Sequence, residues 1–161
     1  MDDTSTSGLS EGALAERIRS AGLRATRPRL TVLSLLTEMG GHHGTDEVLS
    51  VLGKRRSALS RASVFNVLND LVAHGLVMVA DAGPGRTIYE AAGEWHHHFV
   101  CRECGSVFDV PCTVGEKPCL DSGVQGLKID EAQVIFRGPC PFKNGQALPP
   151  DYTAPPNCPN G

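Results

Sequence analysis

Long hydrophobic runs are missing from the sequence. Its longest apolar stretches fall far short of the roughly 20 residues that a membrane-spanning helix needs. The N-terminal stretch MDDTSTSGLSEG contains neither a basic nor an apolar segment and so does not resemble a secretion signal. We therefore expect a cytoplasmic protein with no membrane partner, in which residues 1–9 form a disordered leader.

Cysteine is absent from the first half of the chain. All six cysteines lie in the second half, at Cys101, Cys104, Cys112, Cys119, Cys140 and Cys158. In a reducing cytosol, such clustering indicates metal binding or redox chemistry before structural disulfides. Histidine is clustered as well, in the runs His42-His43 and His96-His97-His98.

An excess of positive charge is also missing, since the net charge is −3. The average hides an asymmetry. Residues 10–75 carry nine Lys and Arg against six Asp and Glu, whereas residues 76–161 carry six against ten. A basic half beside an acidic half fits one part that contacts phosphate and another that binds metal cations.

Four amphipathic helices are expected in the first half. Ser10, Thr26, Thr45 and Ser60 are placed to cap them, and Gly22, Gly40 and Gly75 follow three of them. We expect these helices at about 11–21, between the Thr26 cap and Gly40-Gly41, at about 46–54 and at about 61–74.

After Gly75 the spacing of apolar residues changes from the helical period to the alternation that is typical of strands. LVMVAD and RTIYEA are joined by the turn sequence AGPG and predict a hairpin. Helices followed by a small hairpin predict a winged helix-turn-helix over residues 10–92. The third and fourth helices would form the helix-turn-helix pair.

The second half predicts a smaller α/β domain over residues 93–143. FVCREC and SVFDVP indicate strands around a cysteine-rich turn, residues 113–125 a helix, and residues 127–138 a strand. Residues 144–161 are rich in Pro and Gly and predict a flexible tail. The expected fold class is α+β.

A recognition helix presents hydrogen-bonding side chains to base edges, with basic residues nearby for phosphates. With Val64, Leu68 and Leu71 buried, the fourth helix directs its polar side outwards. A helical bundle with a solvated basic face is the alternative. The candidate DNA-contacting residues are Arg24, Arg27, Arg29, Arg61, Ser63, Phe65 and Asn66.

The segment from His96 to Cys104 is the more specific signal. Cys101-x-x-Cys104 places two thiolates on one tetrahedral zinc ion. In an extended chain His96 and His98 point to one face and His97 to the other. Imidazoles combined with carboxylates make a harder site suited to Fe²⁺, Mn²⁺ or Zn²⁺, so two chemically different metal sites are expected.

The sequence resembles the ferric uptake regulator (Fur) family. GLRATRPRLTVLSLL, HHGTDEVL, LSRASVFNVLNDLVAHGLV and RTIYEAAGEWHHHFVCRECGSVFDV follow the family pattern in order and spacing. The resemblance runs from about Leu14 to Cys140. The segments VPCTVGEKPCL and IDEAQVIFRGPC look most like the branch associated with catalase-peroxidase genes and oxidative stress.

The resemblance implies a homodimer with a C-terminal dimerisation domain that binds an operator inverted repeat in double-stranded DNA when loaded with metal, and so represses. A regulatory Fe²⁺ or Mn²⁺ would bridge the two domains and favour the DNA-binding arrangement. In some relatives Fe²⁺ at such a site reacts with peroxide and oxidises a ligand histidine, which releases the DNA. The implied regulatory ligands are His42, Glu90, His96, His98 and Asp109, and a third site in parts of the family would use His97 and Glu116.

The structural zinc site departs from the family pattern. Relatives use two Cys-x-x-Cys pairs, whereas the second pair here reads Cys140-Pro-Phe-Lys143. Lysine is a poor zinc ligand at neutral pH, so the fourth ligand is Cys158, Cys112, Cys119 or water. Our preference is Cys158, together with Cys101, Cys104 and Cys140.

Other functions remain to be weighed against this one. A zinc or nickel uptake repressor of the same fold would use the same donor types. A zinc-dependent hydrolase is conceivable, although the sequence has no His-Glu-x-x-His pattern. A metal-storage or redox-buffer protein would leave the winged helix unexplained. We therefore predict a regulator and not an enzyme.

Overall fold

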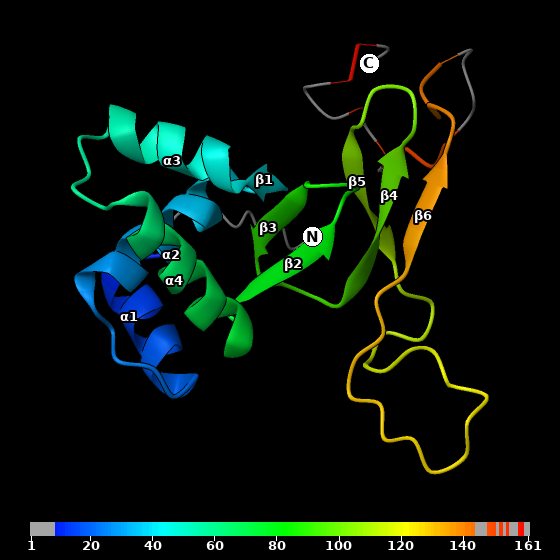
Figure 1. Ribbon diagram of the computed structural model, residues 1–161, viewed down its shortest axis with the longest axis horizontal. Coiled ribbons are helices and arrows are strands. Elements are labelled where there is room, and N and C mark those ends of the chain that lie inside the picture. The colour runs from blue at the N-terminus through cyan, green and yellow to red at the C-terminus, as the bar shows by residue number, and fades with distance from the viewer. Residues whose placement is uncertain (1–8, 144–147, 151, 153, 155–157, 160–161) are drawn as a thin grey trace. The chain divides into compact units, whose positions relative to one another are not determined.

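The computed structural model describes residues 9–143, 148–150, 152, 154, 158 and 159. All of the expected leader except Leu9, and most of the expected flexible tail, lie outside the described residues. Contacts divide the chain into two compact units, Met1–Ala92 and Gly93–Gly161 (Figure 1).

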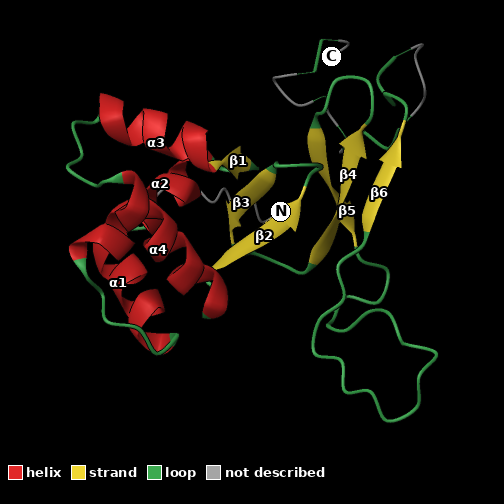
Figure 2. Cartoon of the chain, viewed as in Figure 1, coloured by secondary structure: helices red, strands yellow, loops and turns green. Residues whose placement is uncertain are grey.

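The first unit contains the four expected helices, α1 (Glu11–Ser20), α2 (Arg27–Met39), α3 (Thr45–Lys54) and α4 (Arg61–Ala73). Their apolar faces meet in one core, in which Ile18, Leu36 and Leu68 are fully buried. Figure 2 shows these helices packed around one another. Burial of such side chains contributes about 1.5–3 kcal/mol each relative to exposure.

Helix capping follows the sequence at two of four positions. The side chains of Ser10 and Ser60 accept hydrogen bonds from the first turns of α1 and α4. Thr26 occupies the N-cap of α2 but makes no side-chain capping bond. The prediction for Thr45 was wrong, because Gly44 is the N-cap and Thr45 is already helical.

The predicted hairpin is confirmed as β2 (Val77–Asp81) paired with β3 (Thr87–Ala91). A short strand that the sequence did not indicate, β1 (His43–Gly44), pairs with the other side of β3. The resulting order β1-β3-β2 completes a winged helix-turn-helix. Tyr89 in β3 faces the helical core.

The second unit contains a sheet of order β5-β4-β6, with β4 (His96–Cys101) in the centre. β5 (Val107–Pro111) runs antiparallel to it, and β6 (Ile135–Gly138) runs parallel to it. β4 begins three residues before the expected strand FVCREC, because His96–His98 pair with Asp109–Pro111. Arg102–Cys104 instead form the turn into β5.

Two expectations for the second unit were wrong. Residues 113–125 form turns and loops and not a helix. Gly115, Pro118 and Gly123 interrupt this segment, and each weakens a helix interior. The strand expected at 127–138 is confined to β6, since only Ile135–Gly138 form ladder pairs with β4. Figure 1 shows the resulting long loop before β6 in yellow and orange.

Among the residues that the structure describes, we find no helix with the length and hydropathy to cross a membrane.

Candidate metal centres and DNA-contacting surface

β4 and β5 bring three of the expected regulatory ligands together in the second unit. His96 Nε2 lies 3.3 Å from Asp109 Oδ1. The rings of His96 and His98 are 4.9 Å apart, as expected for side chains two residues apart on one face of a strand. His96 Nδ1 lies 2.9 Å from the carbonyl oxygen of Glu94. Donation from Nδ1 to that carbonyl leaves Nε2 with a lone pair for a metal.

The first unit holds the other two expected regulatory ligands. His42 Nε2 lies 3.4 Å from Glu90 Oε2, and both side chains are about nine-tenths buried. Glu90 reaches this position from β3, while His42 directly precedes β1, which pairs with β3. The neighbouring His43 contacts Glu47 at 3.1 Å and the Gly40 carbonyl. The β1–β3 pairing therefore positions one imidazole and one carboxylate as a buried donor pair.

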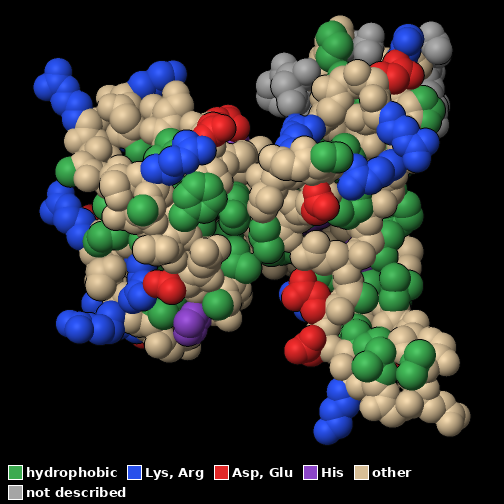
Figure 3. Space-filling model, in the orientation of Figure 1, with side chains coloured by type: hydrophobic (Ala, Val, Ile, Leu, Met, Phe, Trp, Pro, Cys, Tyr) green, Lys and Arg blue, Asp and Glu red, His purple; other side chains and the backbone are tan. Residues whose placement is uncertain are grey.

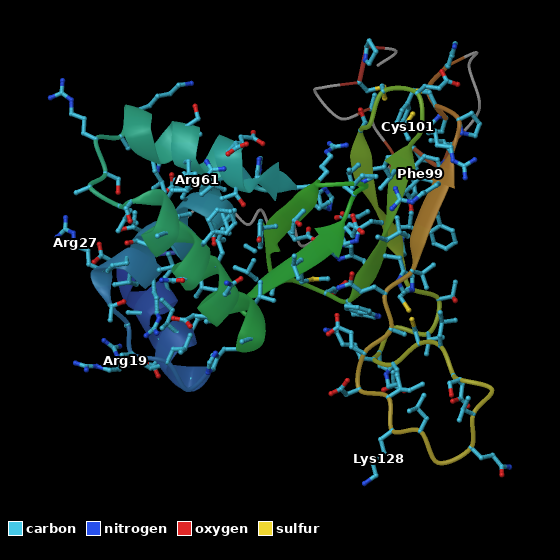
Figure 4. All side chains as sticks on the ribbon, in the orientation of Figure 1. Arg19, Arg27, Arg61, Phe99, Cys101 and Lys128 are labelled. Carbon is cyan, nitrogen blue, oxygen red and sulfur yellow. The ribbon has the colours of Figure 1, made fainter. Side chains whose placement is uncertain are left out.

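A cluster of thiols lies at the other end of β4. The sulfurs of Cys101, Cys104 and Cys140 all lie within 4.8 Å of one another. Cys158 Sγ lies 3.8 Å from Cys104 Sγ and 3.7 Å from Cys140 Sγ. Thiolates on a tetrahedral zinc ion with Zn–S bonds of about 2.3 Å are about 3.8 Å apart. Cys158 is therefore at zinc-ligand separations from Cys104 and Cys140, and these two lie close to Cys101. Figure 4 labels Cys101 in this cluster.

The thiols of the cluster differ in their acidity. A hydrogen bond with the Ser106 hydroxyl lowers the pKa of Cys104 to about 7. Burial raises the pKa of Cys101. The backbone N–H groups of Glu103 and Cys104 both donate to Cys101 Sγ, at 3.4 and 3.5 Å. Such donors stabilise a thiolate in a tight Cys-x-x-Cys turn.

Lys143, which replaces the last cysteine of the family pattern, pairs with a carboxylate. Its Nζ lies 3.0 Å from Glu103 Oε2, and both side chains are exposed. This pairing raises the pKa of Lys143 and lowers that of Glu103. A protonated ammonium has no lone pair, so this contact is consistent with Lys143 being no zinc ligand.

His97 points to the opposite face of the sheet and belongs to a third group. Its Nε2 lies 3.3 Å from Cys119 Sγ, and Cys112 completes a set whose ligand atoms lie within 4.8 Å of one another. Burial, and secondarily His96, lowers the pKa of His97. Glu116, the expected partner of His97, is exposed and is not in this set. In the sequence, Cys112 and Cys119 were candidates only for the fourth ligand of the structural zinc ion. No local sequence pattern indicates that they lie beside His97.

Basic side chains collect on the surface of the helical unit. Arg24 is exposed before α2 and Arg27 is exposed at its start. At the end of α3, Lys54, Arg55 and Arg56 are exposed. Figure 3 shows Lys and Arg side chains along the edge of this unit, and Figure 4 shows Arg27 directed away from the helices. Arg55 is paired with Glu38 at 2.9 Å. Such a surface suits contact with phosphates.

Arg29 has a packing role that the sequence did not indicate. Its Nη2 lies 2.7 Å from Asp70 Oδ2, and its side chain is 20% exposed. Its Nη1 donates to the carbonyl of Arg24 at 2.9 Å. Arg29 thus joins α2 to α4, whereas Arg24 and Arg27 extend into solvent.

α4 presents an exposed polar face. Arg61 lies 2.7 Å from Asp46 of α3 and 5.7 Å from the centre of the Phe65 ring. Phe65 and Asn66 are exposed, whereas Ser63 is half-buried and bonded to the capping Ser60. Exposed ion pairs contribute only about 0–1 kcal/mol, so Arg61 can exchange Asp46 for a phosphate at small cost.

The wing contributes a cation that sequence reasoning missed. Arg86 lies at the tip of the β2–β3 hairpin, where its backbone bonds with Ala82 and Gly83 close the turn. Its side chain is exposed. The hairpin pattern itself was the available signal, because Arg86 directly follows the turn sequence AGPG.

Comparison with known proteins decides the family. The model of the ferric uptake regulator family matches residues 20–136. The chain belongs to the ferric uptake regulator family. The Transcriptional regulator FurA of Mycobacterium tuberculosis is 43% identical over 132 residues, covering 79% of this chain and 87% of that protein.

Two solved structures share the Fur fold. The ferric uptake regulator of Pseudomonas aeruginosa with manganese has a TM-score of 0.62 and 23% identity, covering 79% of this chain and 97% of the other. That of Vibrio cholerae has a TM-score of 0.59 and 25% identity, covering 78% and 98%. The Vibrio cholerae structure reveals a structural rearrangement of its DNA-binding domains.

Membership of the Fur family confirms the predicted α+β class and makes this chain a metal-responsive transcriptional regulator. The zinc-hydrolase alternative is thereby excluded, because members of the family are regulators and not enzymes.

Proposed function

We propose that this Fur-family chain is a metal-activated repressor that binds an operator inverted repeat as a homodimer. The observation that carries the proposal is the ligand geometry of His96, His98 and Asp109 in the second unit, with His96 Nε2 held ready by its Nδ1 contact. The donor set of nitrogen and carboxylate oxygen suits Fe²⁺ or Mn²⁺. A protein of this kind acts in the cytoplasm, where the chromosome lies.

Joint ligation by the two units supplies the proposed mechanism. His42 and Glu90 belong to the helical unit, and His96, His98 and Asp109 belong to the sheet unit. When bound, the metal supplies a positive charge that neutralises the carboxylates. A metal held by ligands from both units would favour the arrangement that suits the operator. The free energy of this preference equals the difference in metal-binding free energy between the two arrangements.

A structural zinc ion completes the proposal. Cys101, Cys104, Cys140 and Cys158 provide four thiolates, of which Cys158 takes the place left by Lys143. The separations of 3.8 and 3.7 Å to Cys104 and Cys140 support Cys158 over Cys112, Cys119 or water.

Dimerisation is supported by apolar exposure in the sheet unit. Phe136 of β6 is 45% exposed, and the loop before β6 exposes further large apolar side chains: Val114, Leu120, Val124 and Leu127. Exposed apolar area of this kind marks an interaction surface. In the proposed homodimer a second copy of the chain covers it.

The proposed target genes are those of iron or peroxide-stress control, on the resemblance of VPCTVGEKPCL and IDEAQVIFRGPC to the catalase-linked branch. A zinc or nickel uptake repressor is the second candidate, because imidazole and carboxylate donors bind those metals as well.

Operator binding titrated with Fe²⁺, Mn²⁺, Zn²⁺ and Ni²⁺ without oxygen separates these candidates. We expect Fe²⁺ and Mn²⁺ to promote binding, and added peroxide to release DNA from the Fe²⁺ form but not from the Mn²⁺ form. Promotion by Zn²⁺ or Ni²⁺ alone would favour the uptake repressor. DNA binding that is indifferent to every metal would overturn the proposal.

A further inference from the structure

The group formed by His97, Cys112 and Cys119 combines two thiols with an imidazole in the sheet unit. All three ligand atoms lie within 4.8 Å of one another. Their elements explain the meeting: His97 lies opposite Val110 in the β4–β5 ladder, and Cys112 follows the end of β5. The chain then turns back, and Cys119 Sγ comes within 3.3 Å of His97 Nε2.

The group is prearranged. His97 is 8% exposed, and its buried Nδ1 has no hydrogen-bond partner among the described residues. The Trp95 ring packs edge-on against it at 5.9 Å. The Gly115 N–H donates to Cys112 Sγ at 3.3 Å, as backbone amides do towards thiolate ligands. Two thiols and one imidazole thus lie close enough together to bind one ion.

The ligand chemistry differs from that of the regulatory residues. Zn–S bonds of about 2.3 Å and Zn–N bonds of about 2.0–2.1 Å place S and N about 3.6 Å apart on a tetrahedral ion. The 3.3 Å between His97 Nε2 and Cys119 Sγ is close to that value. Two thiolates and one imidazole favour Zn²⁺ over Mn²⁺ or Fe²⁺.

We propose that His97, Cys112 and Cys119 form an additional Zn²⁺ site, with three protein ligands and a water in the fourth position. It lies on the opposite face of β4 from His96 and His98. The site fastens the irregular loop that follows β5 to the sheet. Lys117 supports the same attachment, since its Nζ lies 4.2 Å from the centre of the Trp95 ring and 3.7 Å from Glu131.

Metal counting on the full-length protein tests the site. The reduced protein is loaded with Zn²⁺ without oxygen, dialysed against a chelator of moderate affinity, and its zinc is measured by mass spectrometry. We expect the double variant Cys112→Ser, Cys119→Ser to retain one zinc ion per chain fewer than the unaltered protein. His97→Gln, which keeps both thiols, is expected to show the same loss.

Glu116→Gln is the matched control, because Glu116 lies in the same loop but outside the group. It is expected to retain all zinc. Co²⁺ substitution gives a second readout, since the double variant should lose thiolate-to-cobalt absorption that Glu116→Gln keeps. Unchanged zinc and cobalt spectra in the double variant and in His97→Gln would overturn the proposal. Loss of zinc only in Glu116→Gln would overturn it as well, in favour of a carboxylate site.

Discussion

At the residue scale, three consecutive histidines point to two different faces of the sheet, because successive side chains of a strand alternate. His96 and His98 share a face of β4 with Asp109 across the ladder, while His97 faces Cys119 on the other side. The same residue type therefore enters two different donor sets. Nitrogen–oxygen and nitrogen–sulfur sets differ in the metals they prefer.

Replacing His96 or His98 with Ala is expected to abolish metal-stimulated operator binding, because each removes an imidazole from the proposed regulatory site. Binding is compared with and without Mn²⁺ in a DNA-shift assay. His74→Ala is the control, since His74 is an exposed histidine at the end of α4. A full response of either variant to Mn²⁺ would place the regulatory site elsewhere.

Asn66→Ala is expected to weaken operator binding by about 1–3 kcal/mol and to relax sequence preference, as loss of one base contact does. Arg61→Ala should weaken binding to all sequences and reduce the salt dependence. Both are measured by titration at two salt concentrations. Lys128→Ala removes an exposed cation from the sheet unit and serves as the control. Unchanged affinity in both α4 variants would mean that α4 does not contact the DNA.

At the element scale, contacts between helices decide which arginines are available for DNA. Arg27 and Arg29 both lie in the first turn of α2, but Arg27 is exposed, whereas Arg29 contacts Asp70 of α4. The two residues have the same charge but different surroundings. Only the packing of α2 on α4 distinguishes them.

Asp70→Ala is expected to lower the free energy of unfolding by about 1 kcal/mol, because it leaves the largely buried Arg29 without its carboxylate. Arg27→Ala should leave stability unchanged and weaken DNA binding. Urea unfolding and DNA titration of both variants test this contrast. Equal stability of the two variants would contradict the packing role of Arg29.

At the scale of the whole molecule, the two units are stabilised differently. The helical unit has an aliphatic core that includes Leu33, Leu36 and Leu68. In the sheet unit, Cys101, Cys140 and Cys158 form a buried cluster against Phe99 and Phe142. A unit with thiols at its centre gains stability from a metal bound only in the folded state.

Cys158→Ser is expected to weaken zinc binding and to destabilise the sheet unit. Zinc present at 100 times its dissociation constant contributes about 2.7 kcal/mol, which is lost when the ion is no longer bound. Zinc retention and thermal unfolding are measured for Cys158→Ser and for Cys101→Ser. Glu116→Gln is the control, because Glu116 is exposed and lies outside both groups of thiols, and it should retain all zinc. The proposed ligation by Cys158 fails if Cys158→Ser keeps the unaltered zinc affinity while Cys101→Ser loses it.

The sequence by itself determined the elements whose signals are local. Ser10 and Ser60 mark helix starts, periodic Leu and Val mark the helical core, and alternation sets the facing of His96, His97 and His98. These features depend on residues a few positions apart, so a pattern in the chain is sufficient to predict them. The expectation of one thiolate site and one imidazole–carboxylate site also came from residues that lie close together in the sequence.

Only the tertiary structure decided which distant residues meet. β6 is confined to the four residues that pair with His98–Cys101 of β4, and Arg29 contacts Asp70 because α2 packs against α4. The approach of Cys158 to Cys104 and of Cys119 to His97 joins residues 54 and 22 positions apart. Such contacts form because the topology brings residues that are distant in the sequence close together in space. No local sequence pattern identifies which distant residue a side chain will contact.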